Sequence, residues 1–425
     1  MFFNLRRGPL LLFIALLLNI QPVRAADPEG GVMLSTLIEQ ALEVNPRVRQ
    51  LRAGWQAAEQ EIPQAGAWMD PLVGLNIMSL PVRSFDFDRE EMTGKQVQVM
   101  QNIPLPGITG LKEDISEQAA LQAKSYYEDT RNNIVFQLKT AYYSLYHIEK
   151  SLEITEKNKA LLEDFVRIAE SKYATGQGLQ QDVLKAQVEL SKMLEQLIML
   201  RQKSSATSAR INTLLNRDPG KPIGKLAEVA EEPFEYAVEQ LQQMALGNRP
   251  LLQAADAGVR QARLSYELAK KDYWPSLNLG LEYSQRNNRN DLLSGMFSIS
   301  LPVFADRKQR QRVQQTLFEI EAATYQYNDE KNEINQEISE LYSEIKQNLE
   351  LLPLFGEGII PQASQSLQSA IAGYQVNKVD FLTLLDNQLT LFNYEIDYFR
   401  VLTEYRQQIS RMEWVVGQKL MISLQ

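Results

Sequence analysis

Few residues of this chain could take part in catalysis or bind a metal ion. The 425 residues include no cysteine and one histidine, His147. Disulfides, thiolate metal sites, cysteine nucleophiles and histidine-based acid–base groups are therefore nearly excluded. The sequence also has no Gly-x-Ser-x-Gly motif and no phosphate-binding loop. We expect the protein to be no enzyme, and we expect no cofactor and no metal site.

The imidazole and the nearby phenol groups fit a packing role. His147 directly precedes the apolar residue Ile148, and Tyr142, Tyr143 and Tyr146 lie on the same stretch. One imidazole forms no metal site by itself, and tyrosines at this spacing pack between helices more often than they form a substrate cage. The formal net charge of −9 argues against a nucleic-acid partner, because phosphate binding needs a basic face.

Residues 1–25 have the pattern of an export signal. Arg6 and Arg7 precede an apolar run from 10 to 20, and the segment ends at Val23-Arg24-Ala25, a small-residue cleavage site. The apolar run is shorter than the ~20 residues of a membrane-spanning helix, and no later run approaches that length. We expect an exported protein whose membrane-spanning part, if it has one, consists of strands.

Residues recur at a nearly constant distance, which predicts an internal two-fold repeat. Three pairs are each 204 positions apart: Pro46 and Pro250, Gly54 and Gly258, Pro71 and Pro275. The period is far longer than the roughly 20 to 50 residues of solenoid repeats, so one large unit occurs twice. The predicted units are 26–215 and 234–425, joined by a linker at 216–233 that contains proline and glycine and no clear periodicity.

Each predicted unit contains two short strands. Leu277, Leu279 and Leu281 alternate with small or polar residues, which gives one apolar face. The four strands are expected near 71–80, 95–103, 275–284 and 295–302. A sheet of four strands leaves unpaired edges, which are costly in lipid, so other copies of the chain must close it.

The number of chains follows from the size of the closed sheet. Eight strands, from two chains, enclose an interior filled by side chains, whereas twelve, from three chains, begin to leave a lumen. Small residues on the face opposite the leucines, such as Ser276 and Gly280, favour an open lumen. We therefore expect a homotrimer.

The rest of each unit is predicted to be a hairpin of long amphipathic helices, over 111–215 and 306–417. Apolar residues follow the spacing of a left-handed coiled coil in several stretches, one of which is Ile134, Leu138, Ala141, Leu145, Ile148 and Leu152. No proline occurs between Leu111 and Tyr173. Turns are expected at 174–178 and 375–378, where each long helix reverses direction.

At these two turns the sequence resembles a known family. Tyr173-Ala-Thr-Gly176 leads into Gln181-Asp182-Val183, and Tyr374-Gln-Val-Asn377 leads into Leu385-Asp386-Asn-Gln-Leu-Thr-Leu-Phe392. These segments are similar to the paired tip motifs of TolC-like outer-membrane efflux proteins. The resemblance covers nearly the whole mature chain, because it includes the repeated order of helices and strands, the helices that begin at proline and a terminal Val416-Gly417.

The resemblance implies an α+β membrane protein in the outer membrane of a Gram-negative bacterium, with a large periplasmic part. Its long antiparallel coiled-coil hairpins would form an α-barrel, and four strands per chain would form a trimeric 12-stranded β-barrel. Such a channel passes substrates from an inner-membrane pump and its periplasmic adaptor to the exterior. Four further segments look like the heavy-metal-cation branch rather than the drug-export branch: Ala67–Pro71, Leu80–Val82, Glu91–Lys95 and Pro104–Gly107.

The resemblance also assigns roles to residues at the tips. Asp386 aligns with an inward acid ring at the entrance constriction, and Thr383 replaces the sister acid one turn earlier. Asp182 would hydrogen-bond Tyr374 and hold the bore closed. The basic partner expected beyond Tyr374 is missing at Val379, with Lys378 one position away. The alternative for Asp386 is a solvent-exposed position on the helix with no channel role.

The tips lie farthest from the strands, so an adaptor should dock there with its own helical tips. The residues predicted for docking are Gly176, Gln177, Gly178 and Asn377. The rival class is a soluble periplasmic coiled-coil adaptor or scaffold, which explains the helices but not the apolar faces of the strands. For Trp68 and Trp274, which flank strand starts, a membrane-interface girdle and an internal packing role both remain open.

Overall fold

The computed structural model describes residues 32–231 and 233–420. The predicted export signal at 1–25 lies outside the described residues. In chain order the first half comprises α1 (Leu34–Val44), α2 (Pro46–Gly66), β1 (Leu72–Met78), β2 (Gly94–Ile103), α3 (Ile108–Ala174) and α4 (Gln180–Leu214). The second half comprises α5 (Val238–Asn248), α6 (Pro250–Lys271), β3 (Ser276–Gln285), β4 (Leu292–Ser300), α7 (Gln309–Pro353), the π-helix η1 (Leu354–Ile359), α8 (Ile360–Gln375) and α9 (Phe381–Val416).

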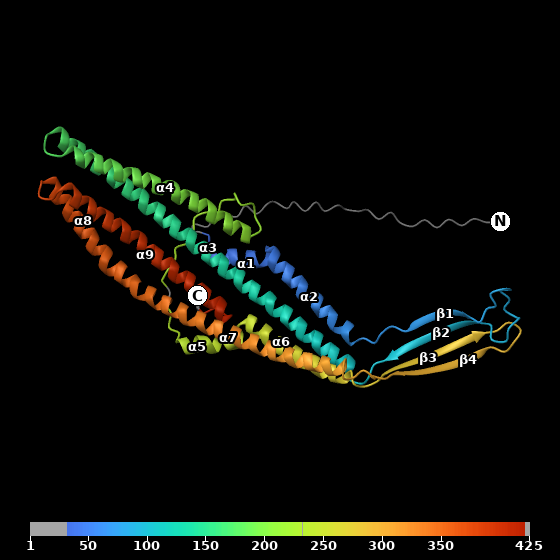
Figure 1. Ribbon diagram of the computed structural model, residues 1–425. Helices are drawn as coiled ribbons and strands as arrows, with labels where there is room; N and C mark the ends of the chain where they lie inside the picture. Colours follow the sequence, from blue (N-terminus) through green and yellow to red (C-terminus); the bar gives the residue numbers. More distant parts are fainter. Residues whose placement is uncertain (1–31, 232, 421–425) are drawn as a thin grey trace, which may run out of the picture.

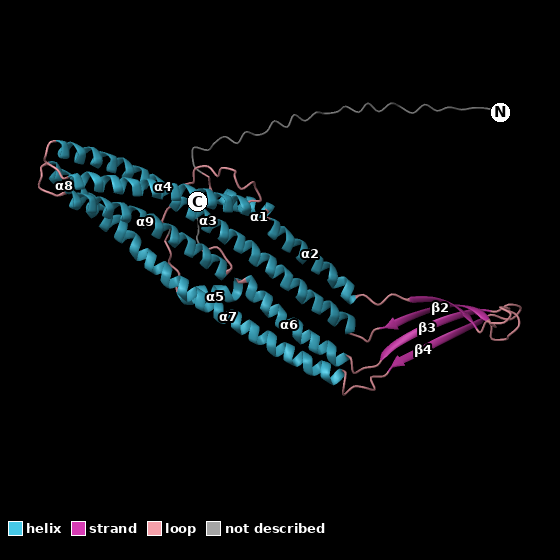
Figure 2. Ribbon diagram, turned by 45° about the horizontal axis from the view of Figure 1, so that its top comes forward, coloured by secondary structure: helices cyan, strands magenta, loops and turns pink. Residues whose placement is uncertain are grey.

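The molecule is elongated, with the sheet at one end and two helical tips at the other (Figure 1). The turn between α3 and α4 and the turn between α8 and α9 form these tips, and α9 ends beside the middle of the helical body (Figures 1 and 2). The 67 residues of α3 run from the sheet to the tip and extend about 100 Å at 1.5 Å per residue.

Short-range signals in the sequence account for where the helices begin. Pro46 is the first residue of α2, where its missing N–H costs no hydrogen bond. The side chain of Asn45 caps this helix by accepting from the backbone N–H of Arg47 at 3.0 Å. Its amide also donates to the carbonyl of Leu214 at 2.9 Å, so the start of α2 is tied to the end of α4. Pro250 occupies the same place in α6.

The outgoing helix of the second hairpin is not continuous. After α7 ends at Pro353, the six residues of η1 have π-helical geometry before α8 starts. Pro353 and Pro361 lack backbone N–H groups, so the regular hydrogen-bond ladder is interrupted on both sides of η1. The sequence analysis expected one long helix between 306 and the turn, and the interruption is a departure from that expectation.

The four strands form one antiparallel sheet in the order β1-β2-β3-β4. The central pair joins the two halves of the chain, with Val97 opposite Tyr283. Alternate residues form an exposed apolar face, and the opposite face is mainly polar but includes Leu72, Met100 and Met296. Members of the apolar face include Val73, Leu75, Ile77, Val97, Val99, Leu279, Leu281, Leu293, Phe297 and Ile299, each at least 43% exposed.

Two hydrophobic clusters hold the helices together. One occupies the middle of the body between α1, α3, α5, α7 and α9, and the other runs toward the tips between α3, α4, α8 and α9. The predicted coiled-coil residues Ile134, Leu138, Ala141, Leu145 and Ile148 are all buried. Leu382, in the first turn of α9, is 49% exposed.

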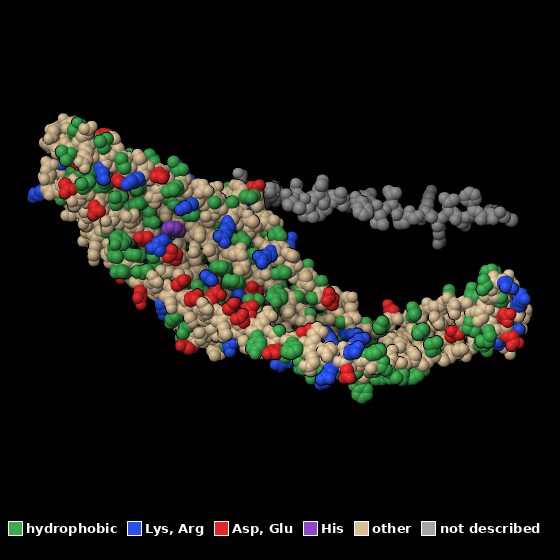
Figure 3. All heavy atoms as spheres, in the orientation of Figure 1, with side chains coloured by type: hydrophobic (Ala, Val, Ile, Leu, Met, Phe, Trp, Pro, Cys, Tyr) green, Lys and Arg blue, Asp and Glu red, His purple; other side chains and the backbone are tan. Residues whose placement is uncertain are grey.

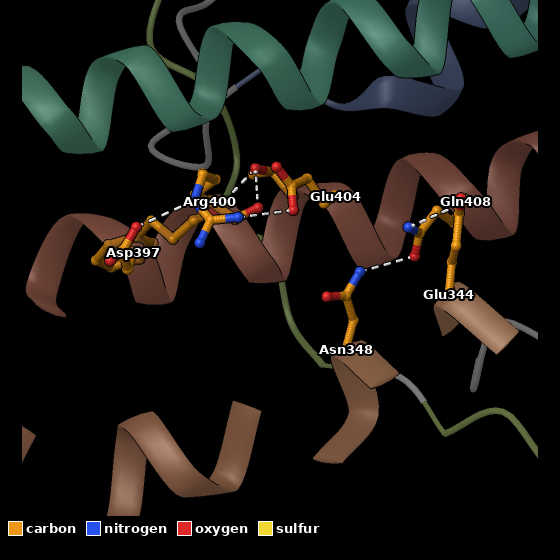
Figure 4. Close-up of polar contacts among 8 residues, drawn as sticks. Glu344, Asn348, Asp397, Arg400, Glu404 and Gln408 are labelled. Atoms are coloured by element: carbon orange, nitrogen blue, oxygen red, sulfur yellow. Dashed lines mark hydrogen bonds and ion pairs between the residues drawn. The ribbon is translucent and has the colours of Figure 1, made fainter. Parts of the chain in front are cut away.

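Polar contacts also connect α7 with α9 (Figure 4). Asn348 on α7 donates from Nδ2 to Oε1 of Gln408 at 2.8 Å, and Gln408 donates to Glu344 at 3.1 Å. Arg400, farther along α9 toward the tip, pairs with Asp397 and Glu404 on its own helix. Within the described residues, no helix combines the length and the apolar character that crossing a membrane requires.

Candidate functional site

The two tip turns rest on backbone geometry that few residue types tolerate. Gly176 has φ of +71°, a left-handed conformation that favours glycine, and Asn377 has φ of +60° in the other turn. Gly178 has no room for a side chain, because a Cβ there would lie 3.0 Å from Cβ of Lys172 and 3.2 Å from the backbone nitrogen of Tyr173. The side chain of Gln177 is exposed, so it is free to contact a partner.

Lys172 joins the two tips. It lies in the last turn of α3, and its Nζ donates hydrogen bonds to the carbonyl oxygen of Tyr374 and to Oδ1 of Asn377. The same ammonium lies 4.2 Å from the centroid of the Tyr374 ring, within range of a cation–π interaction. The basic partner of Tyr374 is therefore not a residue that follows it, as expected, but Lys172, which precedes Tyr173 on the other hairpin.

Tyr374 is close to Asp182, but the predicted hydrogen bond between them is not formed. The Tyr374 hydroxyl is buried and has no hydrogen-bond partner among the described residues. Burial raises the pKa of this phenol, and the nearby negative charge of Asp182 raises it further. The ring packs against Phe381 with a centroid distance of 5.7 Å. Lys378 is exposed and forms no ion pair with another described residue, so it does not supply the missing basic partner.

Thr383 and Asp386 lie in the first two turns of α9. Asp380 caps this helix, because its carboxylate accepts from the backbone N–H of Thr383 at 2.8 Å and from the Thr383 hydroxyl at 3.0 Å. These bonds lower the pKa of Asp380. Thr383 is therefore engaged in helix capping. Asp386 is exposed one turn later, which both the constriction role and the solvent-exposed alternative require.

A buried polar pair lies farther along the tip cluster. Gln388 on α9 donates from Nε2 to Oδ1 of Asn158 on α3 at 2.8 Å. The two residues are 0% and 5% exposed. This contact was missed, although a polar residue inside an apolar coiled-coil stretch is a signal that could have indicated it.

The aromatic cluster on α3 has a structural role. The backbone N–H of Ala227 donates to the hydroxyl of Tyr142 at 3.1 Å, and the hydroxyl of Tyr146 donates to Glu228 at 2.6 Å. These bonds attach the linker to the helical body. Burial is the main reason that the pKa of Tyr142 rises to about 12. Both Tyr142 and Tyr143 are at most 3% exposed, and Tyr143 also borders a cavity of about 410 Å³.

His147 is partly buried, and burial is the main cause of its lowered pKa, followed by the positive charges of Arg400 and Lys203. Its Nδ1 has no hydrogen-bond partner among the described residues. No group of three or more histidine, cysteine, aspartate or glutamate side chains within the described ranges is placed to hold a metal ion.

The polar face of the sheet carries a row of side-chain hydrogen bonds. Asn76 donates to Oε1 of Gln96 at 3.0 Å, and Gln96 donates to Oε1 of Glu282 at 2.9 Å. On the same face, nearer the helices, Asn102 donates to Asn278 at 2.9 Å. These bonds link β1, β2 and β3 on the side opposite the exposed leucines.

Comparison with known proteins identifies the family. The family described as "Outer membrane efflux protein" matches residues 37–217 and 241–418. The chain is 21% identical to the outer membrane protein TolC of Vibrio cholerae over 89% of this chain and 91% of the relative. It is 23% identical to the cobalt-zinc-cadmium resistance protein CzcC of Cupriavidus metallidurans over 74% of this chain and 76% of the relative.

Solved structures share the fold. The outer membrane protein VceC of Vibrio cholerae superposes with a TM-score of 0.77 at 17% identity, covering 92% of this chain and 97% of that one. CusC gives a TM-score of 0.78 at 13% identity over 91% of this chain and 92% of its own. Both confirm the fold class of long helices with a small four-stranded sheet. The chain therefore belongs to the outer membrane efflux protein family, located in the outer membrane with a large periplasmic part.

Proposed function

We propose that this chain is one subunit of a homotrimeric channel that carries solutes from an inner-membrane pump and a periplasmic adaptor across the outer membrane. The observation that supports this most directly is the sheet. Its apolar face is exposed along β1 to β4, and β1 and β4 have no strand partner on their outer sides within the described chain. A neighbouring subunit must pair with these edges if the sheet lies in lipid.

Three chains would give twelve strands in one closed barrel, because each chain contributes four. Its exterior would be the apolar face, and the polar face with Gln96, Asn278 and Glu282 would line a water-filled lumen. The soluble adaptor or scaffold is not favoured, because it would leave residues such as Leu75, 82% exposed, in water without a partner.

At the other end, the tips are the proposed contact with the adaptor. Gln177 is exposed in the first turn, and Asn377 is exposed in the second. Gly176 and Gly178 permit the turn itself, so their part in docking is to bring Gln177 to the surface. The tip also lies farthest from the sheet in the ribbon view (Figure 1), as a contact with periplasmic partners requires.

The tips would also form the entrance constriction. Three copies of Asp386 around a narrow bore would attract cations. Lys172, through its contacts with Tyr374 and Asn377, would hold the two hairpins of one subunit together in the closed state. Asp182 would act on Tyr374 through its charge, since no hydrogen bond joins them.

Heavy-metal cations are the first substrate hypothesis. The similarity to a cobalt-zinc-cadmium resistance protein supports it, together with the strand-flanking segments at 67–71 and 104–107. A wide channel transmits what its pump delivers, so the pump that works with this chain would determine which substrates pass through it.

The test of the proposed function is the oligomeric state of the membrane-inserted protein. Cross-linking in detergent, followed by mass photometry, should give a trimer as the largest stable species. Purified trimers should conduct ions in planar bilayers. A stable dimer or monomer in the membrane fraction would contradict the closure argument, and a conductance no larger than that of the bare bilayer would contradict the channel.

A further inference from the structure

A cavity of about 740 Å³ lies where the helices meet the sheet. The C-terminal ends of α2 and α6, the first turns of α3 and α7, and the adjoining strand ends surround it. Asn102, Ser276 and Ser300, which belong to the polar face of the sheet, are among its lining residues. Part of the lining therefore belongs to the polar face, which is the lumen side in the proposed channel, whereas Ile103, which pairs with Leu277, belongs to the apolar face.

The cavity carries an excess of positive charge. Four cationic side chains line it, with Asp272 as the one acid among the lining residues: Lys112, Lys271, Lys308 and Arg312. None of the three lysines has a carboxylate within ion-pair distance among the described residues. Arg312 reaches Glu319 only at 3.9 Å. Blue side chains gather at this waist between the helical body and the sheet in Figure 3.

Two helices begin at the cavity without a side-chain cap, although backbone carbonyls accept from part of their first N–H groups, Leu105 from Ile108 and Ala305 from Arg310. Neither α3 nor α7 has a side-chain cap or an acidic residue in its first turn. The N-cap of α7 is Lys308, and Arg310 and Arg312 follow it. Cations at the positive end of a helix dipole are unfavourable, whereas an anion bound there is stabilised by free backbone N–H groups and by the cations together.

The lining also indicates what kind of anion fits. Gln309 is 8% exposed, and its Oε1 lacks a hydrogen-bond donor among the described residues. Such a buried acceptor is costly unless a ligand donates to it. Trp68 and Phe304, 57% and 72% exposed, line the same cavity and offer apolar contact. The fitting ligand has an acid group, an apolar body and an N–H or hydroxyl donor.

We propose that this cavity is a binding site for organic anions with an apolar body that pass through the channel. The inference rests on the proposed function, because the cavity faces the lumen only if the polar face of the sheet does. Four cations per chain in three chains, or twelve, would surround the lumen at one level. The site adds a second class of solute to the metal cations of the proposed function.

The test uses trimers in lipid nanodiscs and the probe 8-anilinonaphthalene-1-sulfonate, an aromatic sulfonate with one N–H donor. Its fluorescence is titrated against nanodiscs with and without protein. We expect saturable binding that weakens about a hundredfold in the double variant Lys112→Gln/Lys308→Gln, since two charge-assisted contacts are lost. The matched control Lys185→Gln/Lys221→Gln removes the same charge from exposed positions elsewhere and should bind like the parent.

Each result decides between named outcomes. Equal binding by the Lys112/Lys308 variant, in trimers that still conduct ions, would overturn the anion site and leave the channel function standing. Loss of the trimer or of conductance in the unmodified protein would instead overturn the proposed function and the inference with it. Complete displacement of the probe by sub-millimolar inorganic phosphate would show a site for small ions and overturn the organic ligand.

Discussion

Gln388 of α9 and Asn158 of α3 are joined by a hydrogen bond of 2.8 Å inside the apolar tip cluster, where neither side chain reaches solvent. The pair fixes one relative position of the two helices, because a shift along either axis would leave the buried Oδ1 of Asn158 and the buried Nε2 of Gln388 without each other. Asn158 also donates to the carbonyl of Ile154 at 2.9 Å, which holds its amide in the orientation that accepts from Gln388.

Replacing one partner should therefore cost more than replacing both. We expect Gln388→Leu to destabilise the tip by about 1 to 3 kcal/mol, since Asn158 keeps a buried oxygen without a donor. The double variant Asn158→Leu/Gln388→Leu should recover most of this loss. Urea unfolding of the trimer, followed by tryptophan fluorescence and by protease protection of the tips, measures both. If the single and double variants lose equal amounts of stability, the hydrogen bond is not the source of the destabilisation.

Lys172→Met should open the closed channel. The substitution keeps an unbranched side chain but removes the hydrogen bonds to Tyr374 and Asn377. Each bond from a charged donor contributes about 1.5 kcal/mol, so losing both shifts a two-state equilibrium about a hundredfold. Closed-state conductance in planar bilayers should rise, and cells should become more sensitive to large antibiotics. Lys185→Met on the exposed side of α4 is the control. An equal rise in closed-state conductance in that variant would show that Lys172 does not hold the channel closed.

Asp386→Asn should reduce cation selectivity, because it removes three negative charges from the proposed constriction of a trimer. Thr383→Asp is the reciprocal change, since it restores the acid expected one turn earlier. The reversal potential under a salt gradient should move toward zero for the first variant and away from it for the second. Unchanged reversal potentials in both would place the constriction at other residues.

Leu279→Arg should prevent assembly in the membrane. Leu279 lies on the apolar face of β3, opposite Phe297 on β4. A charge on the lipid side of a barrel costs about 2 to 4 kcal/mol near the bilayer midplane. Ser298→Arg places the same charge on the polar face and should leave the trimer intact. The yield of heat-resistant trimer in outer-membrane fractions compares them, and equal yields would contradict the assignment of the two faces.

His147 should make stability depend on pH, with a definite sign. Burial and the charges of Arg400 and Lys203 lower its pKa in the folded state, while Asp397 opposes them weakly. The unfolded chain therefore binds the proton first, and stability is full above the ordinary histidine pKa of about 6.5 and falls as the pH drops below it. His147→Gln should make the unfolding midpoint less dependent on pH between about pH 7 and pH 5. An unchanged slope would assign the pH dependence to carboxylates.

The strands and the main helical rows could be predicted because their signals are local and periodic. Leu277 to Leu281 alternate strictly with small or polar residues, and the structure shows this segment within β3. The row from Ile134 to Ile148 is buried as its spacing indicates. Even the weaker alternation of the first half appears as β1 and β2, because pairing with β3 compensates for weak local preference.

What the sequence did not indicate depends on contacts between distant segments. Lys172 meets Tyr374 across 202 positions, so no local pattern could show that its charge reaches the second tip. The cationic cavity combines Lys112 with Lys308, which belong to opposite halves of the chain. The π-helix at Leu354–Ile359 had a local signal in Pro353 and Pro361, but proline alone does not tell a kink from a helix end.

The register between β2 and β3 also sets the order in which the exported chain can fold. Lys95 pairs with Gln285, a separation of 285 − 95 = 190 residues. During secretion, the hairpin of β1 and β2 therefore emerges first and waits with a bare hydrogen-bonding edge until the second half arrives. Such late-closing contacts fold slowly and expose aggregation-prone surface. The newly secreted chain consequently keeps the edge of β2 unpaired during that interval, whereas the helices of its first half can already pack.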